Sequence, residues 1–138
     1  MDKIKLLEQI NKQASSTLLE ALGIVVTNIE KDSVSGKMPV NQKTKQPFGL
    51  LHGGASVALA ETLGSIGAGM KIDQETQSVV GIEINASHLK TISSGWVFGE
   101  ANIVRIGKKI QVWEIEIKNK DKQLICKSRL TLATINKK

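Results

Sequence analysis

The segment GGASVALAETLGSIGAGM, residues 53–70, decides the fold of this chain. Its Ala, Leu and Gly content predicts a buried helix, and the only charged residue from Pro47 to Met70 is Glu61. An isolated buried carboxylate either takes up a proton or must find hydrogen-bond donors. If Glu61 were an ordinary solvated residue, a neighbouring Lys or Arg would mark the exposed face of the helix. This segment contains neither. We therefore expect Glu61 to be either paired or catalytic.

The loop before this helix, TKQPFGLLHGG at residues 44–54, contains polar groups suited to catalysis. Gln46 offers an amide, His52 an imidazole, and Gly53 and Gly54 stand where the helix should begin. Glycines leave the N–H groups of a helix start unshielded, and the positive end of the helix dipole lies there, so an oxyanion can be held. Alone, the histidine would more simply be structural and the glycines capping residues. Together with Glu61, they are the groups that attack of water on an acyl carbon requires.

Four segments resemble one known family. They are KQPFGLLHGGASVALAETLGS at 45–65, VVGIEINASHLK at 79–90, GKKIQVWEIEI at 107–117 and CKSRLTLA at 126–133. They resemble hot-dog-fold acyl-CoA thioesterases, in the branch of 4-hydroxybenzoyl-CoA, 1,4-dihydroxy-2-naphthoyl-CoA and enterobactin-pathway proofreading thioesterases. The resemblance spans residues 24–134. It implies an α+β hot-dog fold, an antiparallel sheet wrapped around one long central helix.

The remaining patterns agree with this fold. Residues 24–40 predict two strands joined by a turn at Lys31 to Ser33, and residues after Gln77 predict four more. In QVWEIEIK, residues 111–118, apolar side chains alternate with charged ones, which is typical of a strand with one buried face. We expect one domain over residues 1–138, with a short N-terminal helical segment at 1–22.

The resemblance assigns roles to five residues. Glu61 is expected to act as general base or as nucleophile, and the sequence does not decide between these. The Gly53 N–H would stabilise the oxyanion, Gln46 would position the carbonyl or the water, and His52 would orient the loop or assist the leaving thiolate. Ser65, one turn after Glu61, would hold the water.

If Glu61 and Gly53 serve one reaction centre, helix geometry predicts that they come from two chains with antiparallel helices. Glu61 is eight residues beyond Gly53, which is about 12 Å along a helix axis, too far for one thioester carbonyl to touch both. The resemblance likewise implies a homodimer with shared sites, and a tetramer formed by two such dimers.

The resemblance also places a further set of residues near the CoA moiety or the acyl group: His88, Lys90, Lys108, Lys109, Gly81 and Ile82. The net charge of +6 permits a polyanionic ligand without naming one. Nucleic-acid binding is a weak alternative, because aromatic residues make up only 3% of the chain and no basic-aromatic platform is evident.

No metal or cofactor is expected, because two histidines and one cysteine lie too far apart for ligand spacing, and CoA belongs to the substrate. The single cysteine, Cys126, excludes an intrachain disulfide and is expected in the core. The N-terminal sequence lacks the apolar run of a signal peptide or a membrane span, so we expect a cytoplasmic protein without a membrane partner.

Two other functions remain open on this fold. A hydroxyacyl thioester dehydratase would show a longer Phe-Pro-containing loop after the histidine, which this chain lacks. A non-catalytic acyl-CoA-binding module would not need Glu61. The acyl group itself stays undetermined, since the branch accepts aromatic and short aliphatic groups alike.

Overall fold

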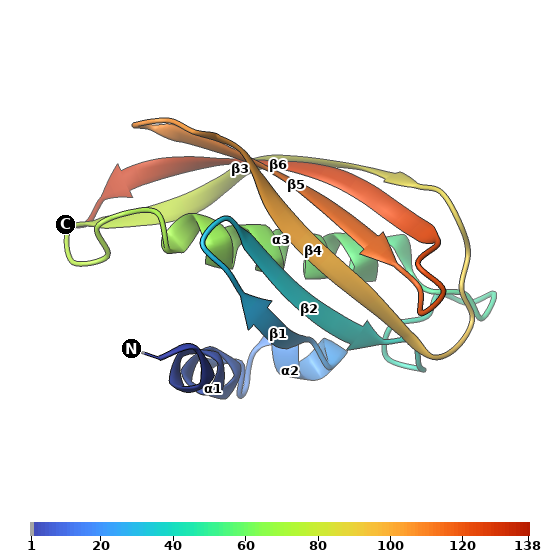
Figure 1. Cartoon of the computed structure of the whole chain (residues 1–138). Coiled ribbons are helices and arrows are strands. Elements are labelled where there is room, and N and C mark those ends of the chain that lie inside the picture. The colour runs from blue at the N-terminus through green and yellow to red at the C-terminus, as the bar shows by residue number, and fades with distance from the viewer. Residues whose placement is uncertain (1) are drawn as a thin grey trace.

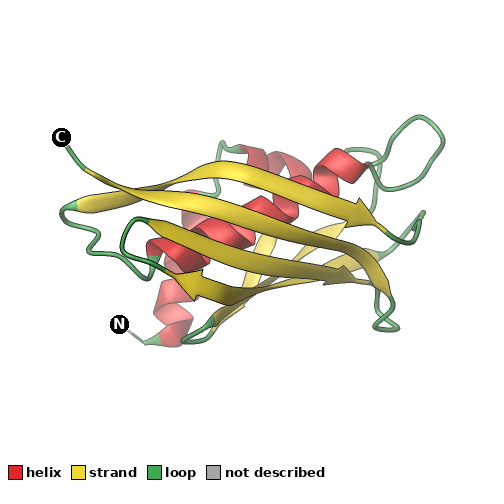
Figure 2. Ribbon diagram, turned by 90° about the horizontal axis from the view of Figure 1, so that it is seen from above, coloured by secondary structure: helices red, strands yellow, loops and turns green. Residues whose placement is uncertain are grey.

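The computed structural model describes residues 2–138, so Met1 of the expected helical segment 1–22 lies outside the described residues. The elements are α1 (Lys3–Gln13), α2 (Leu18–Leu22), β1 (Val25–Ile29), β2 (Ser33–Pro39), α3 (Gly53–Gly69), β3 (Gln77–His88), β4 (Trp96–Ile106), β5 (Ile110–Lys118) and β6 (Leu124–Asn136). The six strands form one antiparallel sheet in the order β1-β2-β4-β5-β6-β3. The sheet wraps around α3 (Figures 1 and 2), which confirms the predicted hot-dog fold.

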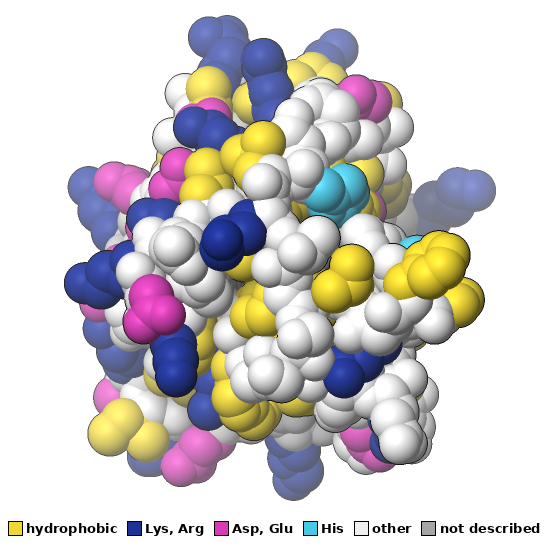
Figure 3. All heavy atoms as spheres, turned by 90° about the vertical axis from the view of Figure 1, so that its right-hand side faces the viewer, with side chains coloured by type: hydrophobic (Ala, Val, Ile, Leu, Met, Phe, Trp, Pro, Cys, Tyr) yellow, Lys and Arg dark blue, Asp and Glu magenta, His cyan; other side chains and the backbone are white. Residues whose placement is uncertain are grey.

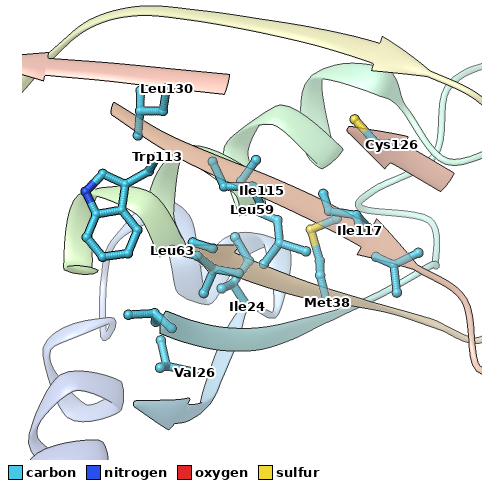
Figure 4. Packing of buried hydrophobic residues seen from close by; sticks show 14 of the residues in the cluster. Ile24, Val26, Met38, Leu59, Leu63, Trp113, Ile115, Ile117, Cys126 and Leu130 are labelled. Atoms are coloured by element: carbon cyan, nitrogen blue, oxygen red, sulfur yellow. The ribbon is translucent and has the colours of Figure 1, made fainter. Parts of the chain in front are cut away.

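Helix α3 is apolar on nearly all sides, and one of its faces lies against the sheet. The buried residues of that face follow the three- and four-residue spacing of a helix stripe: Ala55, Ser56, Leu59, Ala60, Leu63, Gly64, Gly67 and Ala68. Figure 4 shows Leu59 and Leu63 among the isoleucine, methionine and tryptophan side chains of the sheet. The opposite face of α3 carries Glu61.

Glycines let α3 and the sheet approach closely. A Cβ atom at Gly36 or at Gly99, which are paired across β2 and β4, would lie 2.8 Å from a methyl group of Leu63. A Cβ atom at Gly67 would lie 2.6 Å from the Trp113 ring. The glycines that weaken an isolated helix are therefore compensated by tight packing against the sheet.

The alternation predicted in β5 is confirmed. Trp113, Ile115 and Ile117 are buried against α3, whereas Glu114 and Glu116 point to the outer face of the sheet. There both glutamates approach Lys127 of β6, at 3.3 Å and 3.6 Å. The Glu114 carboxylate is the main cause of a raised pKa for the Lys127 ammonium group.

Cys126 lies in the core, as predicted. It is fully buried on the inner face of β6 with Ser128, Leu130 and Leu132. Burial raises the pKa of the Cys126 thiol, because the thiolate is poorly solvated there. Cys126 is therefore a packing residue and a poor nucleophile.

The N-terminal segment folds into two helices that end at specific caps. Thr17 caps α2 by accepting the Leu19 N–H at 3.2 Å, and Gly23 ends the helix in the left-handed conformation with φ of 75°. Thr17 and Glu20 have the spacing of a capping box, but Glu20 accepts the Ser16 N–H at 2.9 Å, one residue before the N-cap Thr17 that such a box would serve.

Only part of the apolar stripe of α1, formed by Ile4, Leu7 and Ile10, meets the core. Leu7 and Ile10 pack against it, whereas Ile4 is 69% exposed. The Asn11 side chain anchors the later turns of α1 to β1 by hydrogen bonds to both the N–H and the C=O of Val26, each 2.9 Å. None of the helices in the described part of the chain is long and apolar enough to cross a membrane.

The packing of α3 predicts that Gly67→Ala lowers the free energy of unfolding by about 1–3 kcal/mol, the usual cost of overpacking against a rigid ring. Gly69→Ala is the matched control, because a Cβ atom there meets nothing within 4 Å, and it should be neutral or stabilising. Urea unfolding measures both variants. Equal effects at the two positions would contradict close helix-to-sheet contact at Gly67.

Candidate active site on the central helix

His52 determines where α3 begins. Its Nδ1 atom accepts the Gly54 N–H at 2.8 Å, and its carbonyl accepts the Ala55 and Ser56 N–H groups at 3.0 Å and 3.2 Å. The neutral imidazole that accepts at Nδ1 carries its proton on Nε2. His52 thus provides acceptors for two of the N–H groups that a helix start leaves without intrahelical partners, those of Gly54 and Ala55, and its own N–H donates to the Thr44 carbonyl at 2.8 Å.

The remaining one of the four groups, the Gly53 N–H, is left free. Within residues 2–138 no carbonyl or side chain accepts it. Gly53 also lies against the His88 ring, since a Cβ atom there would be 2.9 Å from His88 Nε2. The missing side chain keeps this donor open at the positive end of the helix dipole.

The oxygen of the Gln46 side-chain amide is hydrogen-bonded within its own loop. Its Oε1 atom accepts the Phe48 N–H, and its backbone N–H donates to the Leu50 carbonyl at 2.8 Å. The loop is thereby held in a tight turn. Because Oε1 is engaged, the Nε2 group is the part of the amide available to a ligand, and it can only donate.

Gln46 and Gly53 line one cavity of about 330 Å³, which we call the helix-start pocket, whereas His52 is not among its lining residues. Its lining includes Gln46, Gly53, Ser56, His88, Lys90 and Ile125. Figure 3 looks at the end of the molecule that holds the loop before α3 and shows histidine among hydrophobic and uncharged groups. The pocket therefore presents hydrogen-bond donors and a lysine charge, and the described residues that line it include no carboxylate.

Glu61 lies in a different cavity of about 590 Å³, which we call the Glu61 pocket. Its lining includes Leu18, Leu19, Val57, Glu61, Ser65 and Ile66. The carboxylate is half-buried, and within residues 2–138 it makes no ion pair and no hydrogen bond. We expected Glu61 to be either paired or catalytic. The described residues provide no partner for its carboxylate.

Gly81 of β3 makes room for this carboxylate. A Cβ atom at Gly81 would lie 2.7 Å from Glu61 Oε2. The next residue, Ile82, sits at an irregularity in the pairing of β3 with β6 and is 57% exposed. Gly81 is therefore brought to the candidate base, whereas Ile82 lies at the surface beside it.

The structure does not bring all the predicted residues together within one chain. Gln46, Gly53, His88 and Lys90 share the helix-start pocket, while Glu61 and Ser65 line the other. The shared reaction centre expected between two chains thus stays a prediction.

Lys108 and Lys109 are exposed in the turn between β4 and β5. The Lys109 carbonyl accepts the Thr134 N–H at 2.8 Å, whereas His88 pairs with Cys126 near the other end of β6. Within one chain both lysines are therefore at the end of the sheet remote from the helix-start pocket.

Sequence reasoning missed Leu18 and Leu19 as lining residues. Thr17 followed by Glu20 has the spacing of a helix start, but no local signal indicates that the helix lies beside Glu61. It also missed Ser56, whose place four residues after His52 on α3 was visible in the sequence. The described residues contain no group of three His, Cys, Asp or Glu that could hold a metal ion.

The chain belongs to the thioesterase superfamily, whose family model matches residues 48–126. It is 46% identical over 129 residues, 94% of this chain and 93% of the relative, to the proofreading thioesterase EntH of Cronobacter sakazakii. It is 44% identical to the 1,4-dihydroxy-2-naphthoyl-CoA hydrolase of Escherichia coli, covering 94% of each. A solved thioesterase structure from Haemophilus influenzae matches with a TM-score of 0.91 at 45% identity, over 94% of this chain and 90% of that one. These findings confirm the resemblance drawn from the four segments.

The cap geometry predicts that His52→Ala lowers the free energy of unfolding by about 1 kcal/mol, because the Gly54 N–H loses its side-chain acceptor. His52→Asn is the matched control, since asparagine is a good N-cap residue and should retain most of the stability. His52 is exposed, so lost packing contributes little. Urea unfolding compares the three proteins, and an Ala variant as stable as the Asn variant would remove the capping role.

Proposed function

We propose that this protein hydrolyses acyl-CoA thioesters to a free acid and CoA, at sites formed between two copies of the chain. The observation that carries the proposal is a carboxylate, Glu61, without a partner among the described residues, on the helix whose start leaves the Gly53 N–H free. The EntH and dihydroxynaphthoyl-CoA hydrolase relatives support thioester hydrolysis.

In the proposed reaction the thioester oxygen accepts hydrogen bonds from the Gly53 N–H and from Gln46 Nε2. Glu61 either takes a proton from a water that attacks the carbonyl carbon or attacks that carbon itself, giving an anhydride that water then cleaves. The C–S bond breaks and its electron pair leaves with the CoA thiolate, which needs no strong acid. Ser65, one turn from Glu61, holds the water.

The free edge of β3 supports a two-chain site. β3 is the last strand of the sheet, 12 residues long, and its Val80 and Ile82 are 44% and 57% exposed. On α3, Glu61 lies next to Gly81 of this strand, and Gly53 lies next to His88. Antiparallel pairing of two β3 strands about a twofold axis between Ile84 and Asn85 would set position 81 of one copy opposite position 88 of the other.

Such a dimer places the Glu61 of each copy near the Gly53 and Gln46 of the other. It also brings the β4–β5 turn of each copy, which carries Lys108 and Lys109, toward the helix-start pocket of the other copy. These lysines, with His88 and Lys90, are proposed to contact the phosphates of CoA. Pairing of dimers into a tetramer and a cytoplasmic location are proposed on the resemblance alone.

Replacement of the proposed base gives the first test of function. Glu61→Gln should lower turnover by roughly 10²–10⁴-fold, the usual scale for loss of a general base, and should leave substrate affinity largely intact. Thiol release from benzoyl-, phenylacetyl-, dihydroxynaphthoyl- and fatty acyl-CoA measures it. Glu75→Gln, at an exposed position after α3, is the control and should match wild type. Turnover within a few-fold of wild type in Glu61→Gln would make Glu61 structural, and hydration of crotonyl-CoA in place of hydrolysis would favour a dehydratase.

Complementation tests the two-chain site. One variant is Glu61→Ala, and the other is Gln46→Ala with His52→Asn, which keeps the helix cap. Each alone should be nearly inactive, but a mixed dimer contains one site built wholly from intact residues. Unfolding and refolding the two together should recover up to about a quarter of wild-type activity per chain, because half the dimers are mixed and half of their sites intact.

Simple mixing of the folded variants is the control, and it should recover no activity where subunits do not exchange. If heterodimers form, as shown by a tag on one variant, and activity still does not return, the site lies within one chain.

A further inference from the structure

One wall of the Glu61 pocket comes from the N-terminal segment. Leu18 and Leu19 of α2 face Val57, Ala58 and Ile66 of α3 across the cavity. Leu19 is partly buried and packs on the core, whereas Leu18 is 62% exposed. An exposed leucine at the rim of a pocket gains free energy when an apolar ligand removes it from water.

Helix α2 is held firmly enough to serve as a wall. Its first turn is capped by Thr17, which also donates its hydroxyl proton to the Ala14 carbonyl at 2.6 Å. Ala14 is buried, and the left-handed Gly23 turns the chain directly into Ile24, whose N–H donates to the Leu19 carbonyl at 2.9 Å. These local bonds fix the two ends of the short helix, and Leu19 and Leu22 pack it against the core.

The pocket offers few hydrogen bonds to a ligand. The Thr62 hydroxyl, which lines it, already donates to the Ala58 carbonyl at 2.7 Å. Glu61, Ser65 and the acceptor side of the Thr62 hydroxyl are therefore the side-chain groups left to meet polar atoms of a ligand, and Glu61 and Ser65 stand on one face of α3 one turn apart. A polar or charged group placed between α2 and α3 would lose its hydration without a partner.

We infer that α2 selects the acyl group, and that Leu18 and Leu19 hold an uncharged, apolar acyl chain or ring against Val57, Ala58 and Ile66. This inference rests on the proposed function, because the thioester carbon must lie at Glu61 for the acyl group to enter this cavity. The volume of about 590 Å³ is within the range of small-molecule sites and exceeds the need of an acetyl group.

Leu18→Ala tests the inference without a risk to folding, because Leu18 is largely exposed. We expect kcat/KM for hexanoyl-CoA and benzoyl-CoA to fall on the order of 10-fold, and kcat/KM for acetyl-CoA to stay within about twofold. Ile4→Ala is the matched control, since Ile4 is an equally exposed aliphatic residue on α1 that does not line the pocket. It should leave all three values unchanged.

A positive charge at the rim of the Glu61 pocket should weaken its preference for apolar acyl groups. Leu18→Arg should lower kcat/KM for hexanoyl-CoA and raise the ratio of succinyl-CoA to hexanoyl-CoA hydrolysis by roughly 10-fold, because the guanidinium group gives the distal carboxylate a partner. An unchanged ratio would place the acyl terminus away from α2.

Binding of inert thioethers separates this inference from the proposed reaction. S-hexyl-CoA should bind the wild-type protein at least 10-fold more tightly than S-methyl-CoA by calorimetry, and Leu18→Ala should remove most of that difference. This result would uphold the acyl pocket even if no acyl-CoA were hydrolysed, in which case the proposed function alone would fail. Equal affinity for the two thioethers, or an equal loss for acetyl-, hexanoyl- and benzoyl-CoA in Leu18→Ala, would overturn the inference.

Discussion

The close approach of α3 to the sheet is the constraint on which the other features depend. Leu63 fits between the glycines at 36 and 99, and Gly67 lies under the Trp113 ring, so the helix cannot rotate without a steric clash. That contact fixes which face of α3 is buried. It therefore also fixes the direction of the opposite face, which carries Glu61 and Ser65.

A helix that is apolar on all sides needs cover on all sides. The sheet covers one face of α3, and α2 covers part of the other through Leu18 and Leu19. The remainder is the Glu61 pocket, an apolar surface with one carboxylate in it. This carboxylate is half-buried and has no partner within residues 2–138, so it is available to a ligand in the pocket.

Local patterns predicted the elements of this fold well, and they predicted contacts between distant segments poorly. The alternation around Trp113 has the period of a strand, and the isolated charge at Glu61 was visible against its apolar neighbours, because both depend on adjacent residues alone. The place of α2 beside α3 and the separation of the two pockets depend on how distant segments pack. Ile4 shows the same limit, since a helical stripe does not tell which of its turns reaches the core.

The helix start explains why the candidate base and the free donor stand eight residues apart. A carboxylate beside the Gly53 N–H would itself accept that hydrogen bond and would block it from any ligand oxygen. His52 accepts the next three N–H groups and leaves this one open, while Glu61 stands about 12 Å further along the axis. Because they are separated, the Gly53 N–H and the Glu61 carboxylate do not form a hydrogen bond with each other within one chain. A ligand bound between two antiparallel helices could then use the donor of one and the carboxylate of the other.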